Sequence, residues 1–215
     1  MNSSHRLRFF VLAVAFVVLM QSESGRTQGP AAASAATRLE IVKGSKASYH
    51  VREQLARLNF PNDAVGSTES ITGALVIGAD GTFAPEASKI TVDLRTLKTD
   101  EDRRDAFIRD NTLETNRHPT AEFVPRRQKG LPLPLPASGT VNFQLIGDML
   151  LHGVTSEVIW DTAGTFAADT ISVKATTRFN FAKFKITIPK VFGLLSVDDD
   201  IRLELDVRFR RAPAR

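Results

Sequence analysis

The chain has no cysteine, and its 215 residues include only one tyrosine and one tryptophan. Without cysteine, the protein holds no disulfide, no thiolate metal site and no cysteine that could carry a lipid. Its stability must therefore come from a hydrophobic core. The chain is long enough for one sizeable core, and its 42% content of hydrophobic residues is ordinary for a globular protein.

The excess of basic charge is also small, since the formal net charge is only +4. Part of it comes from four arginines crowded at the C-terminus, Arg208, Arg210, Arg211 and Arg215. The sequence contains no basic stripe interleaved with stacking aromatic residues, which nucleic-acid binding would need. We interpret the basic end as a solvated surface and expect no nucleic-acid partner.

Catalytic motifs are missing as well. The four histidines, His5, His50, His118 and His152, lie in separate motifs without zinc-protease spacing, and there is no G-x-S-x-G elbow. We therefore expect no enzyme, no catalytic residue, no metal ligand and no cofactor. Two alternatives remain: a zinc site that assembles three histidines through space, and calcium binding by the three aspartates at 198–200. Those aspartates are typical of a solvated turn, because the glycine and distal glutamate of a calcium loop are missing.

The N-terminal segment resembles an export signal. Arg6 and Arg8 precede an unbroken apolar run at 9–20, which is short for a membrane span but suits a signal-peptide core. Small residues at 31–35 provide A-x-A-like cleavage sites. We expect residues 1–36 to be a signal peptide and flexible leader, and the protein to be periplasmic or secreted. The alternative is an uncleaved N-terminal anchor in the inner membrane.

From residue 38 onward, short segments place apolar residues at every second position, which is typical of strands with one buried face. The predicted strands cover 38–42, 48–52, 72–77, 90–95, 121–123, 141–145, 150–160, 171–176 and 201–210. Turns are expected at Asp80–Gly81, at Gly147–Asp148 and at the three aspartates of 198–200. The proline-rich segment 130–136 is interpreted as a stiff hairpin loop, with a ligand for a proline-binding domain as the alternative.

One charged helix is expected at about 100–112. Thr99 is the predicted N-cap, and carboxylates follow it in the first turn, where the helix dipole favours negative charge. Asp100 with Arg104 and Asp105 with Arg109 are acidic-before-basic pairs four residues apart, which support a short exposed helix.

About eight strands with one apolar face each must bury those faces against one another. Parallel sheets would show continuous apolar runs, and the helices are too few to cover an open sheet. A sandwich and a closed barrel remain, and a barrel of about eight strands leaves room for one small ligand.

The order and spacing of several motifs resemble the YceI-like family across almost all of the chain after the leader. These motifs lie at 48–53, 89–100, 104–109, 118–123, 139–141 and 150–155. The resemblance implies an all-β fold, a lipocalin-like eight-stranded antiparallel β-barrel with a short helix, over residues 37–212. It also implies an exported protein that binds a long polyisoprenoid or similar amphiphilic lipid inside the barrel, for carriage or storage in the cell envelope.

With a barrel implied, the apolar residues expected to face its interior become the candidate lipid-binding residues. They are Tyr49, Val51, Ile90, Val92, Leu94, Phe123, Val141, Phe143, Leu145, Ile171, Val173, Phe179 and Phe181. Each methylene group that they remove from water contributes about 0.8 kcal/mol. The alternative is that these residues fill a solid core, and that the protein is an envelope stress or interaction protein whose barrel is only a scaffold. Membrane-surface contact and a homodimer are further expectations that the sequence leaves open.

Overall fold

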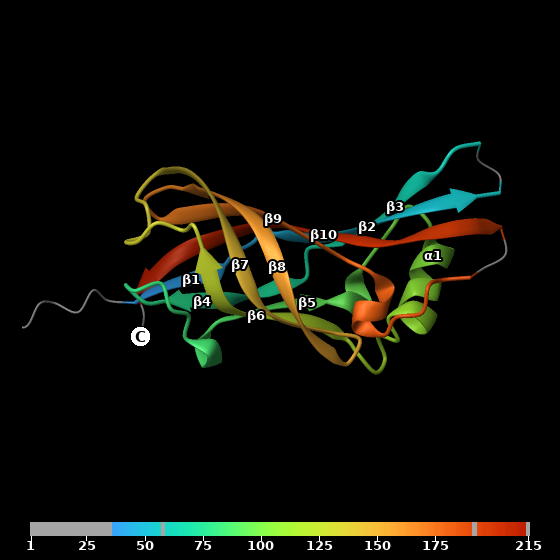
Figure 1. Ribbon diagram of the computed structural model, residues 1–215, viewed down its shortest axis with the longest axis horizontal. Helices are drawn as coiled ribbons and strands as arrows, with labels where there is room; N and C mark the ends of the chain where they lie inside the picture. The colour runs from blue at the N-terminus through green and yellow to red at the C-terminus, as the bar shows by residue number, and fades with distance from the viewer. Residues whose placement is uncertain (1–35, 57–58, 191–192, 214–215) are drawn as a thin grey trace, which may run out of the picture. The chain divides into compact units, whose positions relative to one another are not determined.

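The structure, a computed structural model, describes residues 36–56, 59–190 and 193–213, and its strands are all antiparallel (Figure 1). The strands are β1 (Thr37–Ile41), β2 (Lys46–Leu55), β3 (Asn62–Thr68), β4 (Ile71–Ile77), β5 (Lys89–Asp93), β6 (Thr120–Lys129), β7 (Gly139–Leu151), β8 (Val154–Phe166), β9 (Thr170–Phe179) and β10 (Leu194–Pro213). The leader expected at 1–36 lies outside the described residues, apart from residue 36.

Eight of these strands close into a barrel. They follow the order β1-β4-β5-β6-β7-β8-β9-β10, and β10 pairs back onto β1. This closure confirms the predicted lipocalin-like barrel, in which the strands bury their apolar faces by turning them toward one axis. The β2–β3 hairpin is added to the edge of β10 beyond the part that pairs with β1.

Strand β10 is long enough to carry both β1 and β2 along one edge. Ile41 of β1 pairs with Phe209, and Ala47 of β2 pairs with Leu205. The buried Ser45 bridges the gap between these two ladders, because its hydroxyl accepts a hydrogen bond from the Arg208 amide at 3.0 Å. The hairpin therefore extends the barrel wall at one end, where the ribbon shows β2, β3 and the first half of β10 projecting together (Figure 1).

The helical segments are short: α1 (Asp102–Phe107), the π-helical turn η3 (Ile108–Thr112), and the 3₁₀ turns η1 (Pro85–Ala87), η2 (Leu94–Thr96) and η4 (Phe181–Phe184). The helix predicted at about 100–112 is therefore confirmed, but its expected cap is wrong. The N-cap residue is Glu101, which makes no side-chain capping bond. Thr99 instead donates its amide, at 2.8 Å, and its hydroxyl, at 2.7 Å, to the buried Asp105 carboxylate.

Two expected turns are also wrong. Strand β7 runs straight through Gly147 and Asp148, and the chain turns only at His152 and Gly153. Gly147 is a point of close approach, because a Cβ there would lie 2.2 Å from the Val124 carbonyl oxygen.

The three aspartates at 198–200 lie inside β10, at a shift in its register against β2 that marks a β-bulge. Asp199 accepts a hydrogen bond from the Phe181 amide at 2.8 Å, and Asp200 forms an ion pair with Arg178 at 2.5 Å. In the part of the chain that the structure describes, none of the helices combines the length and apolar character needed to cross a membrane.

Candidate ligand-binding site

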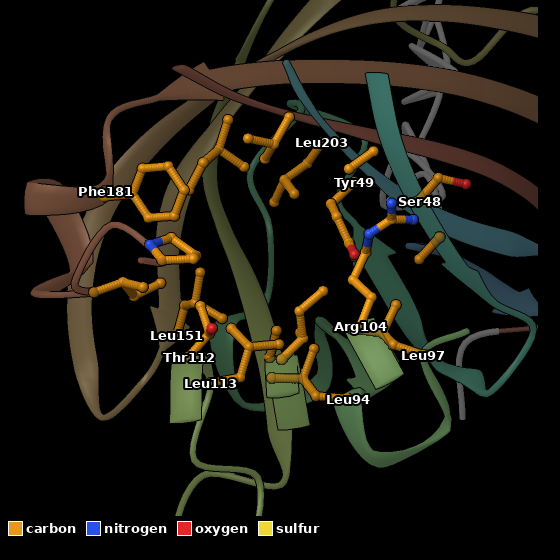
Figure 2. A pocket seen from close by; sticks show the side chains of 18 of the residues that line it. Ser48, Tyr49, Leu94, Leu97, Arg104, Thr112, Leu113, Leu151, Phe181 and Leu203 are labelled. Atoms are coloured by element: carbon orange, nitrogen blue, oxygen red, sulfur yellow. The ribbon is translucent and has the colours of Figure 1, made fainter. Parts of the chain in front are cut away.

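A cavity of about 690 Å³ occupies the end of the barrel where β2 and β10 extend (Figure 2). Its walls come from β2, β5, β6 and β10, with single residues or pairs from β7, β8 and β9, and the helical segments η2, α1, η3 and η4 contribute further side chains. Apolar residues predominate, among them Leu55, Leu97, Phe107, Ile108, Leu113, Met149, Leu151, Ile186, Leu203 and Leu205. A volume of this size lies within the usual range for small-molecule sites, which are mostly apolar with a few polar groups.

The predicted lipid-binding residues divide between two ends of the barrel. Eight line the large cavity: Tyr49, Val51, Ile90, Val92, Leu94, Phe123, Phe179 and Phe181. Four others, Phe143, Leu145, Ile171 and Val173, surround only a small void of about 50 Å³. Val141 borders neither space and packs against the core. The barrel is therefore hollow at one end and filled at the other.

Aromatic side chains separate the hollow end from the filled end. The rings of Phe123 and Trp160 meet edge to face with centroids 6.1 Å apart, and both residues border the large cavity and the small void. Ile90 also borders both the large cavity and the small void. These buried side chains form the floor of the large cavity, which we call the aromatic floor.

Sequence reasoning missed the residues that α1, η3 and β10 bring to the cavity. Leu203 and Leu205 carried a usable signal, because they belong to the unbroken alternation of β10 and face the same way as Ile201 and Val207. Phe107 and Leu113 carried none, since nothing in the periodicity of a short exposed helix shows that it covers an opening.

Three polar atoms buried at the cavity wall have no hydrogen-bond partner among the residues that the structure describes. They are the hydroxyl oxygens of Tyr49 and Thr112 and the indole nitrogen of Trp160. Burial raises the pKa of the Tyr49 phenol, so this group stays a neutral hydroxyl in the folded protein. Because buried polar groups normally have partners, these neutral atoms are candidate contacts for a polar group of a ligand.

The cationic group beside Tyr49 is already paired with carboxylates. Figure 2 shows the Arg104 guanidinium beside the Tyr49 hydroxyl. Arg104 forms ion pairs with Glu53 at 3.0 Å and with Asp100 at 2.5 Å, which confirms the predicted Asp100–Arg104 pair. Burial by itself would lower the pKa of Arg104, but these two carboxylates raise it, so the guanidinium keeps its charge. An additional anion beside Arg104 would have to compete with two carboxylates.

Two of the histidines meet outside the cavity. His118 and His152 lie with ring centroids 5.0 Å apart, and together with Glu114 they form a group of side chains with metal-binding atoms. His50 is separate and lies beside Glu204, with 3.3 Å between Nε2 and Oε2. The histidine motifs are separate in the sequence, but the fold brings His118 and His152 together.

A closed antiparallel barrel of eight strands with an apolar cavity at one end places the protein in the class of lipocalin-like barrels. The family model of the YceI-like domain matches residues 42–209. The chain belongs to the YceI-like family.

Relatives by sequence and by structure agree with this assignment. The chain is 31% identical over 139 residues to a UPF0312 protein of Pseudomonas putida, with 58% of this chain and 68% of the relative covered. Among solved structures it resembles a polyisoprenoid binding domain from Saccharophagus degradans, with a TM-score of 0.60, 14% identity, and 83% of this chain and 99% of the other covered. It also resembles BcnA of Burkholderia cenocepacia, with a TM-score of 0.56, 15% identity, and coverage of 76% and 95%.

Proposed function

We propose that this protein binds one long-chain isoprenoid or similar amphiphilic lipid, with the apolar chain inside the 690 Å³ cavity. The observation that carries the proposal is the cavity itself. The free energy falls when a hydrocarbon chain replaces water in an apolar space of this size. The solved structure described as a polyisoprenoid binding domain supports it, since that domain shares the barrel fold.

The polar atoms at the cavity favour a ligand with an uncharged head. The Tyr49 and Thr112 hydroxyls and the Trp160 indole are neutral donors without a partner, whereas Arg104 is occupied by two carboxylates. A hydroxyl or carbonyl oxygen on the ligand would satisfy one of these donors without displacing an ion pair. We therefore propose an alcohol or carbonyl head group in preference to a diphosphate.

The same atoms support a binding role without catalysis. A hydroxyl becomes a nucleophile when a neighbouring base accepts its proton, and within 36–56, 59–190 and 193–213 neither the Tyr49 nor the Thr112 hydroxyl has a hydrogen-bond partner. Carriage or storage of the lipid in the cell envelope, with export directed by the N-terminal segment, is the physiological part of the proposal. It rests on the apolar run and small residues of the sequence.

Apolar side chains also stand exposed beside the cavity. Phe60 and Leu195 are 79% and 67% exposed, in the β2–β3 connection and at the start of β10. These two regions are adjacent, because the Ala56 amide donates to the Gly193 carbonyl at 2.9 Å, and both of those residues line the cavity. We propose that this apolar tip contacts a membrane surface, so that a lipid passes between membrane and cavity.

The single tryptophan makes the binding proposal directly testable. Trp160 lies in the aromatic floor, so its fluorescence should change when a chain enters the cavity. We would titrate the full chain with isopentenol, farnesol and geranylgeraniol. Each added isoprene unit should tighten binding more than tenfold until the chain exceeds the cavity. Unchanged fluorescence, together with native mass spectra that show only empty protein, would contradict the proposal.

A further inference from the structure

Three side chains with metal-binding atoms converge outside the cavity, next to residues that line it. Glu114, His118 and His152 each offer one ligand atom, and these atoms all lie within 4.8 Å of one another. Glu114 and His118 come from the connection between η3 and β6, while His152 lies in the turn between β7 and β8. All three residues are half-buried, so the cluster is neither a free surface patch nor a closed core.

The orientation of His152 leaves a lone pair facing a carboxylate. Its Nδ1 lies 3.3 Å from the Phe184 carbonyl oxygen, which can only accept, so Nδ1 carries the proton of the neutral ring. The unprotonated Nε2 then lies 3.8 Å from Oε1 of Glu114. A nitrogen lone pair and a carboxylate oxygen repel each other unless a proton or a cation lies between them. Metal-binding histidines commonly donate their second N–H to a backbone carbonyl in this way.

The Glu114 carboxylate is also held in place. Its Oε2 accepts a hydrogen bond from Arg117 at 2.7 Å, which leaves Oε1 directed at His152. The backbone carbonyl of Glu114 accepts from the His118 amide at 2.9 Å, and this tight turn brings the two side chains to the same place. Both oxygens of the carboxylate are therefore assigned, one to an arginine and one to the cluster.

The backbone around the cluster is strained. Among the described non-glycine residues, positive φ occurs at Glu114 (47°), His152 (51°) and Lys185 (53°), and Lys185 directly follows the carbonyl that orients His152. Such conformations are uncommon outside glycine and concentrate at functional sites. Gly153 makes room for the imidazole of His118, because a Cβ there would come within 2.7 Å of its Cε1 atom.

From these contacts we propose that Glu114, His118 and His152 bind one Zn²⁺ ion, with a water molecule in the fourth position. Zinc takes imidazole nitrogen and carboxylate oxygen at about 2.0–2.2 Å, which places neighbouring ligand atoms about 3.3 Å apart. The three ligand atoms lie within 4.8 Å of one another, so zinc binding would require them to move closer together. Calcium and magnesium prefer sites made only of oxygen, so two imidazoles exclude them.

The metal would tie together three segments of the cavity wall. Leu113 and Leu151, the neighbours of Glu114 and His152, line the cavity, as does Phe181 of the η4 turn that supplies the Phe184 carbonyl. Zinc at this position fixes those segments relative to one another. The proposal concerns this site alone and does not depend on which ligand, if any, the cavity holds.

Calorimetric titration of the chelator-treated, untagged full chain with zinc chloride tests the site. One ion should bind per chain, and Glu114→Gln, His118→Gln and His152→Gln should each weaken binding at least about tenfold, the lower bound of the loss seen for changes to the groups that support metal ligands. His50→Gln is the matched control. His50 also lies beside a glutamate, Glu204, but the described part of the chain offers no third ligand there, so its loss should leave affinity unchanged.

Two further measurements separate a metal site from a protonated histidine–glutamate pair. Cobalt in place of zinc should give the visible absorption of a four- or five-coordinate ion, and this absorption should vanish in Glu114→Gln, a variant that preserves side-chain shape. Zinc should also raise the unfolding midpoint of the wild type as its concentration increases. Absence of zinc binding, equal affinity in all four variants, or stabilisation by acid but not by zinc would overturn the proposal.

Discussion

The aromatic ring of Tyr49 lies so close to Gly66 that a Cβ built on the glycine would come within 2.2 Å of the Tyr49 Cε1 atom. The two residues are paired directly across β2 and β3. Gly66 has no positive φ that would require glycine, so its role is to leave space for the ring. The ring in turn forms part of the cavity wall.

We therefore expect Gly66→Ala to push the Tyr49 ring toward the cavity. Forcing a methyl group into a filled space typically costs about 1–3 kcal/mol, and the displaced ring should also weaken binding of geranylgeraniol. Urea unfolding and Trp160 fluorescence measure the two effects. In a Tyr49→Ala background the same Gly66→Ala change should cost little, because the neighbour that it meets is gone. An equal cost in both backgrounds would show that the Tyr49 ring is not the obstacle.

Removing the Tyr49 hydroxyl should stabilise the empty protein. An unpartnered buried hydroxyl costs about 1–3 kcal/mol, and Tyr49→Phe removes it while keeping the ring. The variant should also bind an alcohol-headed chain more weakly than the wild type if the hydroxyl contacts the ligand. Urea midpoints at pH 7 and fluorescence titrations give both numbers, and a less stable Tyr49→Phe protein would indicate a hydrogen bond that the structure does not show.

The same residue predicts an alkaline dependence of stability. Burial raises the pKa of Tyr49 in the folded state, whereas an unfolded tyrosine titrates near pH 10. The unfolded chain therefore loses its phenolic proton first, and stability falls above about pH 10 by up to about 1.4 kcal/mol per pH unit. Because this is the only tyrosine, Tyr49→Phe should remove that component of the slope. Identical slopes in both proteins between pH 9 and 11 would contradict the assignment.

The sequence predicted the barrel because alternation shows which residues of a strand share a face. The clean pattern of 201–210 was sufficient to place Ile201, Val207 and Phe209 in the core. Alternation does not say where the barrel is hollow, because Phe143 and Val51 face inward in the same way. The difference arises from which side chains meet across the barrel. That depends on strand stagger and on the covering segments α1 and η4.

The turn signal at Asp80–Gly81 was correct, but the other two failed for a related reason. Gly147 and the aspartates at 198–200 have the composition of turns, but close strand contact explains the glycine, and a bulge in β10 accommodates the aspartates. The meeting of His118 with His152 was equally hidden, since it depends on a tight turn at Glu114 and on a carbonyl of η4. These features arise between segments that are distant in the sequence.

A matched pair of substitutions should distinguish the hollow end from the filled end. Leu145→Ala removes a buried side chain beside the aromatic floor and should cost about 2–5 kcal/mol, because the surrounding core cannot relax fully. Leu203→Ala removes the same atoms from a half-buried position that already faces the open cavity, so its cost should be clearly smaller.

Ligand binding should respond in the opposite order. Leu203→Ala should weaken binding of geranylgeraniol, because it removes apolar contacts with the isoprenoid chain. Leu145→Ala should leave the affinity nearly unchanged under conditions in which the variant is folded. Urea unfolding and Trp160 fluorescence measure the two properties. Equal losses of stability at both positions would mean that the cavity is closed by packing in solution.

The exposed apolar tip predicts a separation between the rate of lipid transfer and the strength of lipid binding. Phe60 and Leu195 stand beside the cavity but are not among its lining residues. The double variant Phe60→Ser with Leu195→Ser should therefore keep the affinity for geranylgeraniol in detergent-free buffer. It should, however, extract the same lipid from phospholipid vesicles several-fold more slowly, because less apolar area is available to contact the membrane.

The control is Ile159→Ser, which removes another exposed apolar side chain, 48% exposed, from β8. Transfer rates from vesicles should be unaffected by this control, and an equal slowing in both proteins would mean that general surface hydrophobicity, rather than the tip beside the cavity, governs the encounter with the membrane.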